Sequence, residues 1–224
     1  MFEYAYIRDR IEPFRPDLIG REGQLAFQIA ARRLADETLG LQEETLFTCP
    51  ANSLWAPVYV PTTDWKISVF IVKAEYQKPD GTFCPLPLYN QEEVENLTRH
   101  THNQAGVMAA YTSVQGNFWP NRPPAIDTQI RAIVAYKPIG DFDEVDFGPD
   151  YEDALVQGAL AHLLMLPGQH RDPQGAALAE ERFISMSSSL RGINLIGDAG
   201  YYRASVKPRR HHFGGAMRQD MLRY

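Results

Sequence analysis

The apolar residues of this chain follow helical spacing near both ends and strand-like spacing in the middle. At the first end, small or apolar residues recur at intervals of 4, 3, 4 and 4 residues: Ile19, Gly23, Ala26, Ala30 and Leu34. That spacing lines one face of a helix. It predicts a helix over 17–38 that starts after Pro16, is capped by Asp17 and ends by Gly40.

Two further helices are indicated near the other end. One begins at Pro149-Asp150 and ends at Pro167-Gly168, and its small residues Ala154, Gly158 and Ala161 would let a neighbouring helix approach closely. The next begins at Asp172-Pro173. Its apolar positions recur at intervals of 4, 3, 4 and 3 residues: Ala179, Phe183, Met186, Leu190 and Ile193. We expect these two helices to form a hairpin, with the helix at 17–38 packed on it.

The middle of the chain reads as short strands. Runs rich in β-branched and aromatic residues occur at 45–49, 57–61, 67–72, 107–114, 118–120 and 128–136. Pro79-Asp80-Gly81-Thr82 predicts a turn between two strands, and 91–98 predicts one short helical turn. The fold class we expect is α+β: a helical body with an inserted antiparallel sheet or sandwich and an extended C-terminal tail. The expected division is 1–40, 41–140, 141–198 and 199–224.

Charge is distributed unevenly along the chain. Seven acids and no Lys or Arg occupy the stretch 141–153: Asp141, Asp143, Glu144, Asp146, Asp150, Glu152 and Asp153. From 199 to 224, six bases face one acid, so this tail carries +5 and the preceding residues −11, for a net charge of −6. A basic tail on an acidic body suits nucleic acid or an acidic patch on a neighbouring subunit.

Composition and motifs exclude several classes of protein. With 44% hydrophobic and 22% charged residues, the chain has an ordinary globular composition. No apolar stretch reaches the roughly 20 residues of a membrane span, and the start reads as no secretory signal. Two cysteines, Cys49 and Cys84, build neither a disulfide framework nor a zinc site alone, and we expect reduced thiols. Phosphate-binding, dinucleotide-binding, Gly-x-Ser-x-Gly and His-Glu-x-x-His motifs are missing.

Weak candidates for chemistry remain. His100 and His102 could share one face of a strand, but a metal would need another ligand, so exposed loop histidines are the simpler interpretation. The serines at 187–189 read as small polar positions on the outer face of the third helix. We expect most aromatic residues of the strand region to be in the core, and leave Trp119 open, because a sugar-binding sandwich would display such a ring.

The order of these segments resembles a known family. The strand Ile133-Val134-Ala135-Tyr136-Lys137-Pro138 is followed by the acidic stretch, then by Tyr151-Glu152-Asp153-Ala154-Leu155-Val156-Gln157-Gly158-Ala159-Leu160-Ala161-His162-Leu163-Leu164-Met165-Leu166-Pro167-Gly168, and then by Asp172-Pro173 with Arg182-Phe183 in the next helix. With Asn117-Phe118-Trp119-Pro120-Asn121-Arg122-Pro123, this arrangement resembles the head-to-tail adaptor (connector) proteins of tailed bacteriophages, close to the tail tubular protein A class. Gln169-His170-Arg171 departs from the Trp-containing segment that is common in that family.

The resemblance implies a structural virion protein with no catalytic residues, cofactor or metal. It would form a homo-oligomeric ring, commonly of twelve copies, beneath the portal protein. The ring would contact a tail or nozzle protein, with viral DNA passing through its lumen and no membrane involved. Two alternatives stay open: a stopper or tail-terminator ring, and a small carbohydrate-binding or hydrolytic β-sandwich.

On this interpretation two groups of residues carry the contacts. Docking on the portal or on a neighbour would use the tail residues Tyr201, Tyr202, Arg203, Lys207, Arg209, Arg210 and Phe213. The subunit interface would use acidic and small residues: Asp141, Asp143, Glu144, Asp146, Asp150, Gly158 and Ala161.

Overall fold

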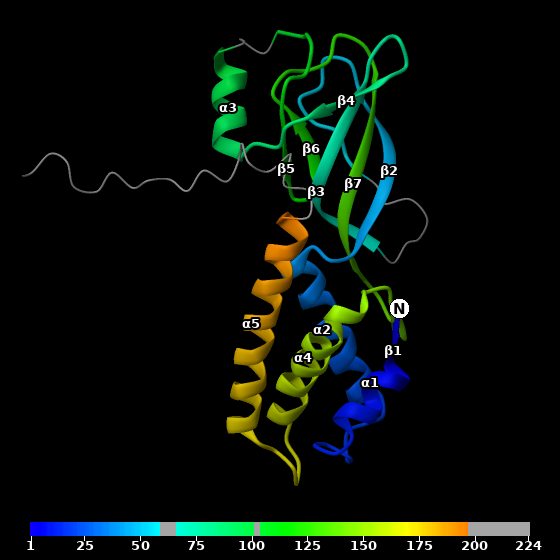
Figure 1. Ribbon diagram of the computed structural model, residues 1–224, viewed down its shortest axis with the longest axis vertical. Helices are drawn as coiled ribbons and strands as arrows, with labels where there is room; N and C mark the ends of the chain where they lie inside the picture. Colours follow the sequence, from blue (N-terminus) through cyan, green and yellow to red (C-terminus); the bar gives the residue numbers. More distant parts are fainter. Residues whose placement is uncertain (59–65, 101–103, 197–224) are drawn as a thin grey trace, which may run out of the picture.

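The fold is α+β, as expected, with most of the helices at one end and an antiparallel β module, which includes one further helix, at the other (Figure 1). The computed structural model describes residues 1–58, 66–100 and 104–196. In chain order the elements are β1 (Phe2–Glu3), α1 (Tyr4–Ile11), α2 (Arg21–Thr38), β2 (Gln42–Cys49), β3 (Lys66–Gln77), β4 (Phe83–Leu86), α3 (Gln91–His100), β5 (Tyr111–Val114), β6 (Asn117–Pro120), β7 (Thr128–Pro138), β8 (Glu144–Val145), the 3₁₀ turn η1 (Pro149–Tyr151), α4 (Glu152–Met165) and α5 (Pro173–Ile196).

Helices α1, α2, α4 and α5 form a bundle around one apolar core. The small face predicted for α2 is buried at Gly23, Ala26, Ala30 and Leu34. Helix α4 contacts α1, α2 and α5, which explains why its sequence is apolar nearly all the way round. The expected hairpin of α4 and α5, with α2 packed on it, is confirmed.

The beginning of the bundle differs from the prediction. Helix α2 starts at Arg21 rather than Asp17, and its N-cap residue, Gly20, makes no side-chain cap. Asp17 instead binds the buried side chain of Arg15. Helix α1 was not predicted, although Ile7 and Ile11, one helical turn apart, are both fully buried. The helix lacks a side-chain cap, so a local start signal is missing.

The β module has two layers. Its main sheet has the strand order β2-β7-β3-β4, with every neighbouring pair antiparallel. The predicted turn connects β3 to β4, with Gly81 at φ +84°. A second layer is the β5–β6 hairpin, whose Phe118 ring lies 5.6 Å from the Phe47 ring of the main sheet. Helix α3 lies outside this layer and begins with a capping box between Asn90 and Glu93. The helix is longer than the single turn that we expected.

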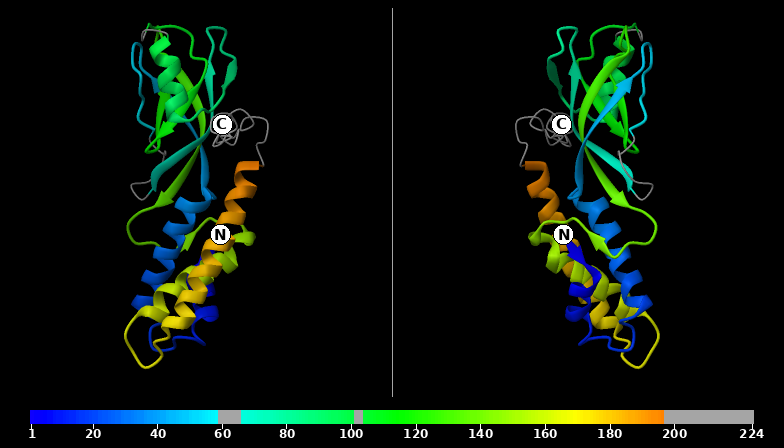
Figure 2. Two further views of the ribbon diagram at one scale, coloured as in Figure 1. Left: turned by 90° about the vertical axis from the view of Figure 1, so that its left-hand side faces the viewer. Right: turned by 90° about the vertical axis from the view of Figure 1, so that its right-hand side faces the viewer.

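The two ends of the molecule have separate cores that meet at the link between α2 and β2. Leu39 belongs to the core of the β module, whereas Leu41 and Tyr136 belong to the core of the bundle. In the same region the ion pair Lys137–Asp36, at 2.8 Å, connects β7 to α2, and Lys66–Glu43, at 2.6 Å, connects β3 to β2. The side views show that α5 runs back along the bundle toward the β module (Figure 2).

Candidate functional site

The acidic segment that follows β7 lies across the surface of α2. The Phe142 ring packs edge-on against Phe27, with centroids 6.0 Å apart, and the Arg32 guanidinium lies over the same ring. Gln28 Nε2 donates a hydrogen bond of 2.9 Å to the carbonyl of Phe142. Because one aromatic ring and several backbone carbonyls hold the segment, its acidic side chains are left to face solvent.

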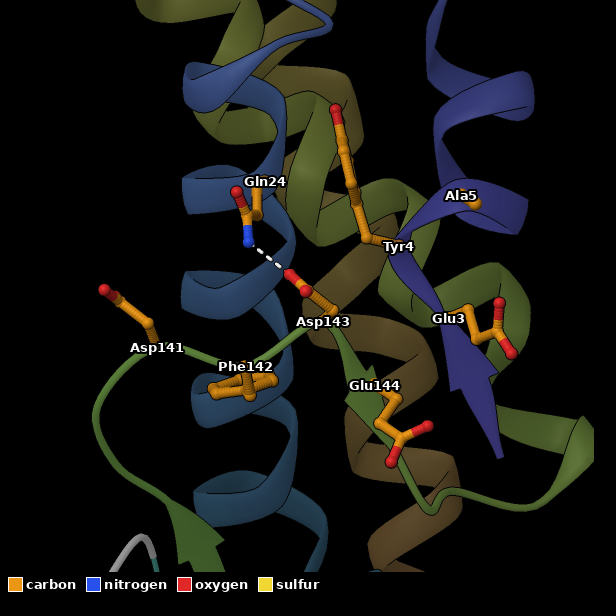
Figure 3. A pocket seen from close by; sticks show the side chains of 8 residues that line it. All are labelled: Glu3, Tyr4, Ala5, Gln24, Asp141, Phe142, Asp143 and Glu144. Atoms are coloured by element: carbon orange, nitrogen blue, oxygen red, sulfur yellow. Dashed lines mark hydrogen bonds between the residues drawn. The ribbon is translucent and has the colours of Figure 1, made fainter.

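The same segment then pairs with the beginning of the chain. The backbone N–H of Tyr4 donates to the carbonyl of Asp143 at 2.7 Å, and the Asp143 side chain accepts a hydrogen bond from Gln24. Strand β8 pairs antiparallel with β1, with Phe2 opposite Val145 and Glu3 opposite Glu144. Two segments more than 140 residues apart in sequence therefore build one small two-stranded ribbon on the bundle (Figure 3).

Part of the negative charge is neutralised by the bundle itself. Arg10 on α1 binds both Glu152 and Asp153, the latter at 3.0 Å. Tyr6 donates to Glu152 at 3.2 Å, and this hydrogen bond and the carboxylate charge raise the pKa of Tyr6. The amino group of Met1 lies 3.5 Å from Asp146. These contacts leave less free charge on the segment than its sequence suggests.

The rest of the negative charge gathers on one surface, which we call the acidic face: Glu3, Asp141, Asp143 and Glu144. All four are exposed, and they line an open hollow of about 870 Å³ together with Tyr4, Ala5, Gln24 and Phe142 (Figure 3). Within the described residues, none of the four has an ion-pair partner. Glu3 was not among the predicted site residues, because nothing local in the sequence signals the pairing of β1 with β8.

Opposed like charges are the main electrostatic feature of this face. Glu3 and Glu144 are directly opposite in the ladder, an arrangement that destabilises an antiparallel pair. Over the described ranges, no three His, Cys, Asp or Glu side chains are grouped to hold a metal ion. The four exposed carboxylates give this face a negative potential.

The predicted interface residues are divided between surface and core. Asp141, Asp143, Glu144, Asp146 and Asp150 are exposed on the bundle surface. Gly158 and Ala161 are buried inside this chain, so their expected contact with a neighbouring subunit is wrong. A Cβ at Gly158 would lie 2.9 Å from Phe183 and 3.0 Å from the Cβ of Ala30, because α4 is enclosed by α2 and α5.

Several other predicted residues cannot be placed. The docking residues Tyr201, Tyr202, Arg203, Lys207, Arg209, Arg210 and Phe213 lie outside the described residues, as do His102, Tyr59 and Trp65. His100 is the last residue of α3. Most of the strand expected at 57–61 is also undescribed, although Ala56 pairs with Phe118 as a single bridge.

The exposure of the remaining serine, tryptophan and cysteine candidates shows where each side chain lies. Ser187 is 1% exposed, so it lies on the inner face of α5, whereas Ser188 and Ser189 lie on the expected outer face. Trp55 is 48% exposed and Trp119 is 38% exposed, so neither ring lies in the core of the β module. Both cysteines are free thiols, and burial raises the pKa of Cys49 to about 11.

Comparison with known proteins adds no relative. Neither the protein-family models nor the curated proteins searched match this chain. Among the helices in the described part of the chain, none has the length and apolar character needed to cross a bilayer.

Proposed function

We propose that this chain is an adaptor subunit of a tailed bacteriophage, a structural protein of the virion without enzymatic activity. Copies form a homo-oligomeric ring, on the family pattern a dodecamer, that docks beneath the portal protein. The ring joins the capsid to a tail or nozzle protein and leaves a lumen for viral DNA. The order of helix, β module and helix pair agrees with the family that the sequence resembles, and that resemblance underlies the proposal.

The observation that carries the proposal is an acidic face on the bundle of a chain that ends in a basic sequence. The acidic face lies on the bundle, while the tail from 199 to 224 carries +5. A contact between the acidic face of one copy and the tail of the next would be head-to-tail, and such contacts close into rings when the rotation between neighbours allows it.

The position of α5 supports a tail that reaches another molecule. The described part of α5 runs toward the β module, and Arg191 on its last turns reaches the carbonyl of Glu37 at 3.5 Å. The 26 residues from 199 onward span at most roughly 85 Å when extended. That length is sufficient to cross a neighbouring subunit or to enter a portal ring.

The net charge of the body agrees with a DNA channel. The residues before 199 carry −11, and a wall lined with Lys and Arg would bind the phosphates that have to slide past it. An acidic body around the lumen avoids that retention. This argument concerns passage of DNA, with no sequence-specific contact to it.

Deletion of 199–224 tests the proposal. The truncated chain is expected to fold, because both cores lie within the described residues before 197, but to lose binding to purified portal rings in sedimentation and negative-stain images. A charge-only variant, with Arg203, Lys207, Arg209 and Arg210 changed to Gln, separates charge from the apolar groups of the tail. Changing the exposed Arg171 and Arg182 to Gln is the matched control outside the tail. Normal binding by the truncated chain would contradict the role of the tail.

The same images decide between positions in the neck. If the chain is a stopper or tail-terminator ring, it should not bind to purified portals. Particles made without it should then be altered at the tail end. Binding to neither portal nor tail would remove the virion interpretation altogether. Metal analysis and a glycan-binding screen then test the remaining class, the carbohydrate-binding or hydrolytic β-sandwich.

A further inference from the structure

Two exposed tryptophans lie together on the outer side of the β5–β6 layer. Ala56 and Phe118 exchange two backbone hydrogen bonds of 2.9 and 3.0 Å, which places Trp55 across from Trp119. Phe118 is fully buried against the main sheet, so the next residue, Trp119, points away from it. At 48% and 38% exposure, the two rings form a surface that we call the tryptophan ledge (Trp55 and Trp119).

The opposite side of the β module has a hollow in the main sheet. Glu44, Lys73, Glu75, Arg131, Ala132 and Ile133 line it, with a volume of about 270 Å³. Leu46, which is 60% exposed, is the register partner of Arg131 and flanks this surface. We call this surface the sheet hollow.

The side chains that line the sheet hollow carry no net charge. Its two acids and two bases balance, since Glu75 binds Arg131 and also lies 3.5 Å from Lys73. The Arg131 guanidinium lies over the Phe83 ring at 4.4 Å, and its side chain is still 43% exposed. Glu44 is exposed at the rim and can accept a hydrogen bond. An exposed cation beside an acceptor can bind an aromatic ring that carries an N–H donor.

We propose that the tryptophan ledge of one copy packs into the sheet hollow of the next copy. An indole ring stacks on Arg131, and its Nε1–H donates to Glu44. The inference rests on the proposed function in that it assumes a ring, and it names the contact between β modules. Because ledge and hollow lie on opposite sides of one module, each copy offers one surface to each neighbour, as a head-to-tail ring requires.

A side chain fits the hollow better than a free small molecule does. Its volume is below the roughly 300–1,000 Å³ that is usual for small-molecule sites, and four charged side chains line it. The ledge exposes about 200 Å² of aromatic surface, roughly a quarter of what one partner buries in a standard interface. Two tryptophans of that size act as the energetic centre of a larger contact that includes the bundles.

Directed cross-linking between two proteins that each carry one accessible cysteine tests which surfaces meet. Cys84 is changed to Ser to remove the half-exposed native thiol, and the fully buried Cys49 is kept. One protein then carries Asn117→Cys, two residues from Trp119 and on the same side of β6, and the other carries Leu46→Cys beside the hollow. A short bismaleimide should give dimers in the mixture and at least tenfold fewer with either protein alone.

Controls separate this contact from random collision and from misfolding. A partner with Leu178→Cys, which is 49% exposed on α5, should cross-link to Asn117→Cys no better than background. The double variant Trp55→Ala, Trp119→Ala should reduce the mixed dimer at least tenfold. Leu46→Glu should do the same; because position 46 is then occupied, its cross-linking cysteine is placed at Thr48. Both variants should leave the circular dichroism spectrum unchanged. These side chains are exposed, so the folded monomer should tolerate the changes.

The outcomes are distinguishable from those of the portal experiment. Dimers between identical positions, equal yields with Leu178→Cys, or no mixed dimer in a chain that still forms rings would overturn this inference and leave the ring standing. A specific mixed dimer in a chain that never binds portal would uphold the contact and overturn the adaptor role. Loss of the mixed dimer when a soluble glycan is added before the bismaleimide would assign the ledge to sugar binding instead.

Discussion

Arg15 and Asp17 form a bidentate ion pair inside the tip of the bundle: Nε and Nη2 of Arg15 each lie 3.0 Å from an oxygen of Asp17. Arg15 is fully buried, and its Nη1 donates to the carbonyls of Leu163 and Leu166, the latter at 3.1 Å. These carbonyls lie at the C-terminal end of α4, where the helix runs out of backbone donors; that of Leu163 also accepts from the backbone N–H of Leu166, its C-cap residue. One guanidinium thus closes the C-terminal end of α4 and connects it to the loop before α2.

Replacing Arg15 by Met should destabilise the bundle strongly. The Leu163 and Leu166 carbonyls would each lose the hydrogen bond from Arg15 and Asp17 would lose its partner, so we expect a loss of about 3–5 kcal/mol in urea unfolding. Arg21→Ala, at an exposed position, is the control and should change stability by less than about 0.5 kcal/mol. Equal effects of the two substitutions would show that the clamp does not stabilise the fold.

Two helical glycines should respond to substitution with opposite signs. Gly158→Leu would force side-chain atoms into Phe183 and Ala30, and we expect destabilisation by at least about 1–3 kcal/mol. Nothing lies within 4 Å of a Cβ at Gly192 in α5, so Gly192→Ala should stabilise the chain by about 0.4–1 kcal/mol. Chemical denaturation of both variants measures the difference. A tolerated Leu at 158 would contradict the close packing of α4 between α2 and α5.

Replacing Glu144 opposite Glu3 should raise the stability of the fold and weaken assembly. Glu144→Lys replaces a repulsion across the β1–β8 ladder with an attraction, so thermal unfolding should show a gain of about 0.2–1 kcal/mol. If the acidic face binds the basic tail, the same substitution should weaken ring or portal binding measured by sedimentation. Glu181→Lys, an exposed acid on α5, is the charge-matched control. If Glu144→Lys assembles normally, the acidic face does not take part in assembly.

The Arg33–Glu180 pair should make stability fall in acid. Arg33 Nη1 and Nη2 donate to the two oxygens of Glu180 at 2.9 and 2.6 Å, and these hydrogen bonds lower the pKa of Glu180 in the folded chain. A carboxyl with a lowered folded pKa stabilises the fold above its unfolded pKa of about 4.3 and loses that contribution as the pH falls below it.

Urea unfolding at pH 7 and pH 3.5 measures this dependence. Glu180→Gln should be less stable than the parent at pH 7, and the difference should shrink at pH 3.5, where the carboxyl is mostly protonated in the unfolded chain. Glu181→Gln serves as the control, because Glu181 has no ion-pair partner within the described residues. A constant difference between Glu180→Gln and the parent at both pH values would refute the assignment.

Local sequence patterns predicted the helices and strands well where one face is buried. The α2 stripe, the α4–α5 hairpin and the turn at 79–82 each depend on residues a few positions apart, and the structure has them. The acid-rich composition of 141–153 is also evident from sequence alone. Trp55 shows the limit of prediction from local patterns. It precedes Ala56, which pairs with Phe118, but the local sequence does not show whether the Trp55 side chain faces the core or solvent.

The sequence by itself determined the periodicities, the fold class and the separation of acidic and basic segments. These properties follow from residues that are close together in the chain. Only the tertiary structure decided that Glu3 lies opposite Glu144, that Arg15 closes α4, and that the small face of α4 is enclosed by this chain's own helices. Each of these is a contact between distant segments, set by how whole elements pack, and no short-range spacing encodes which partner a face will meet.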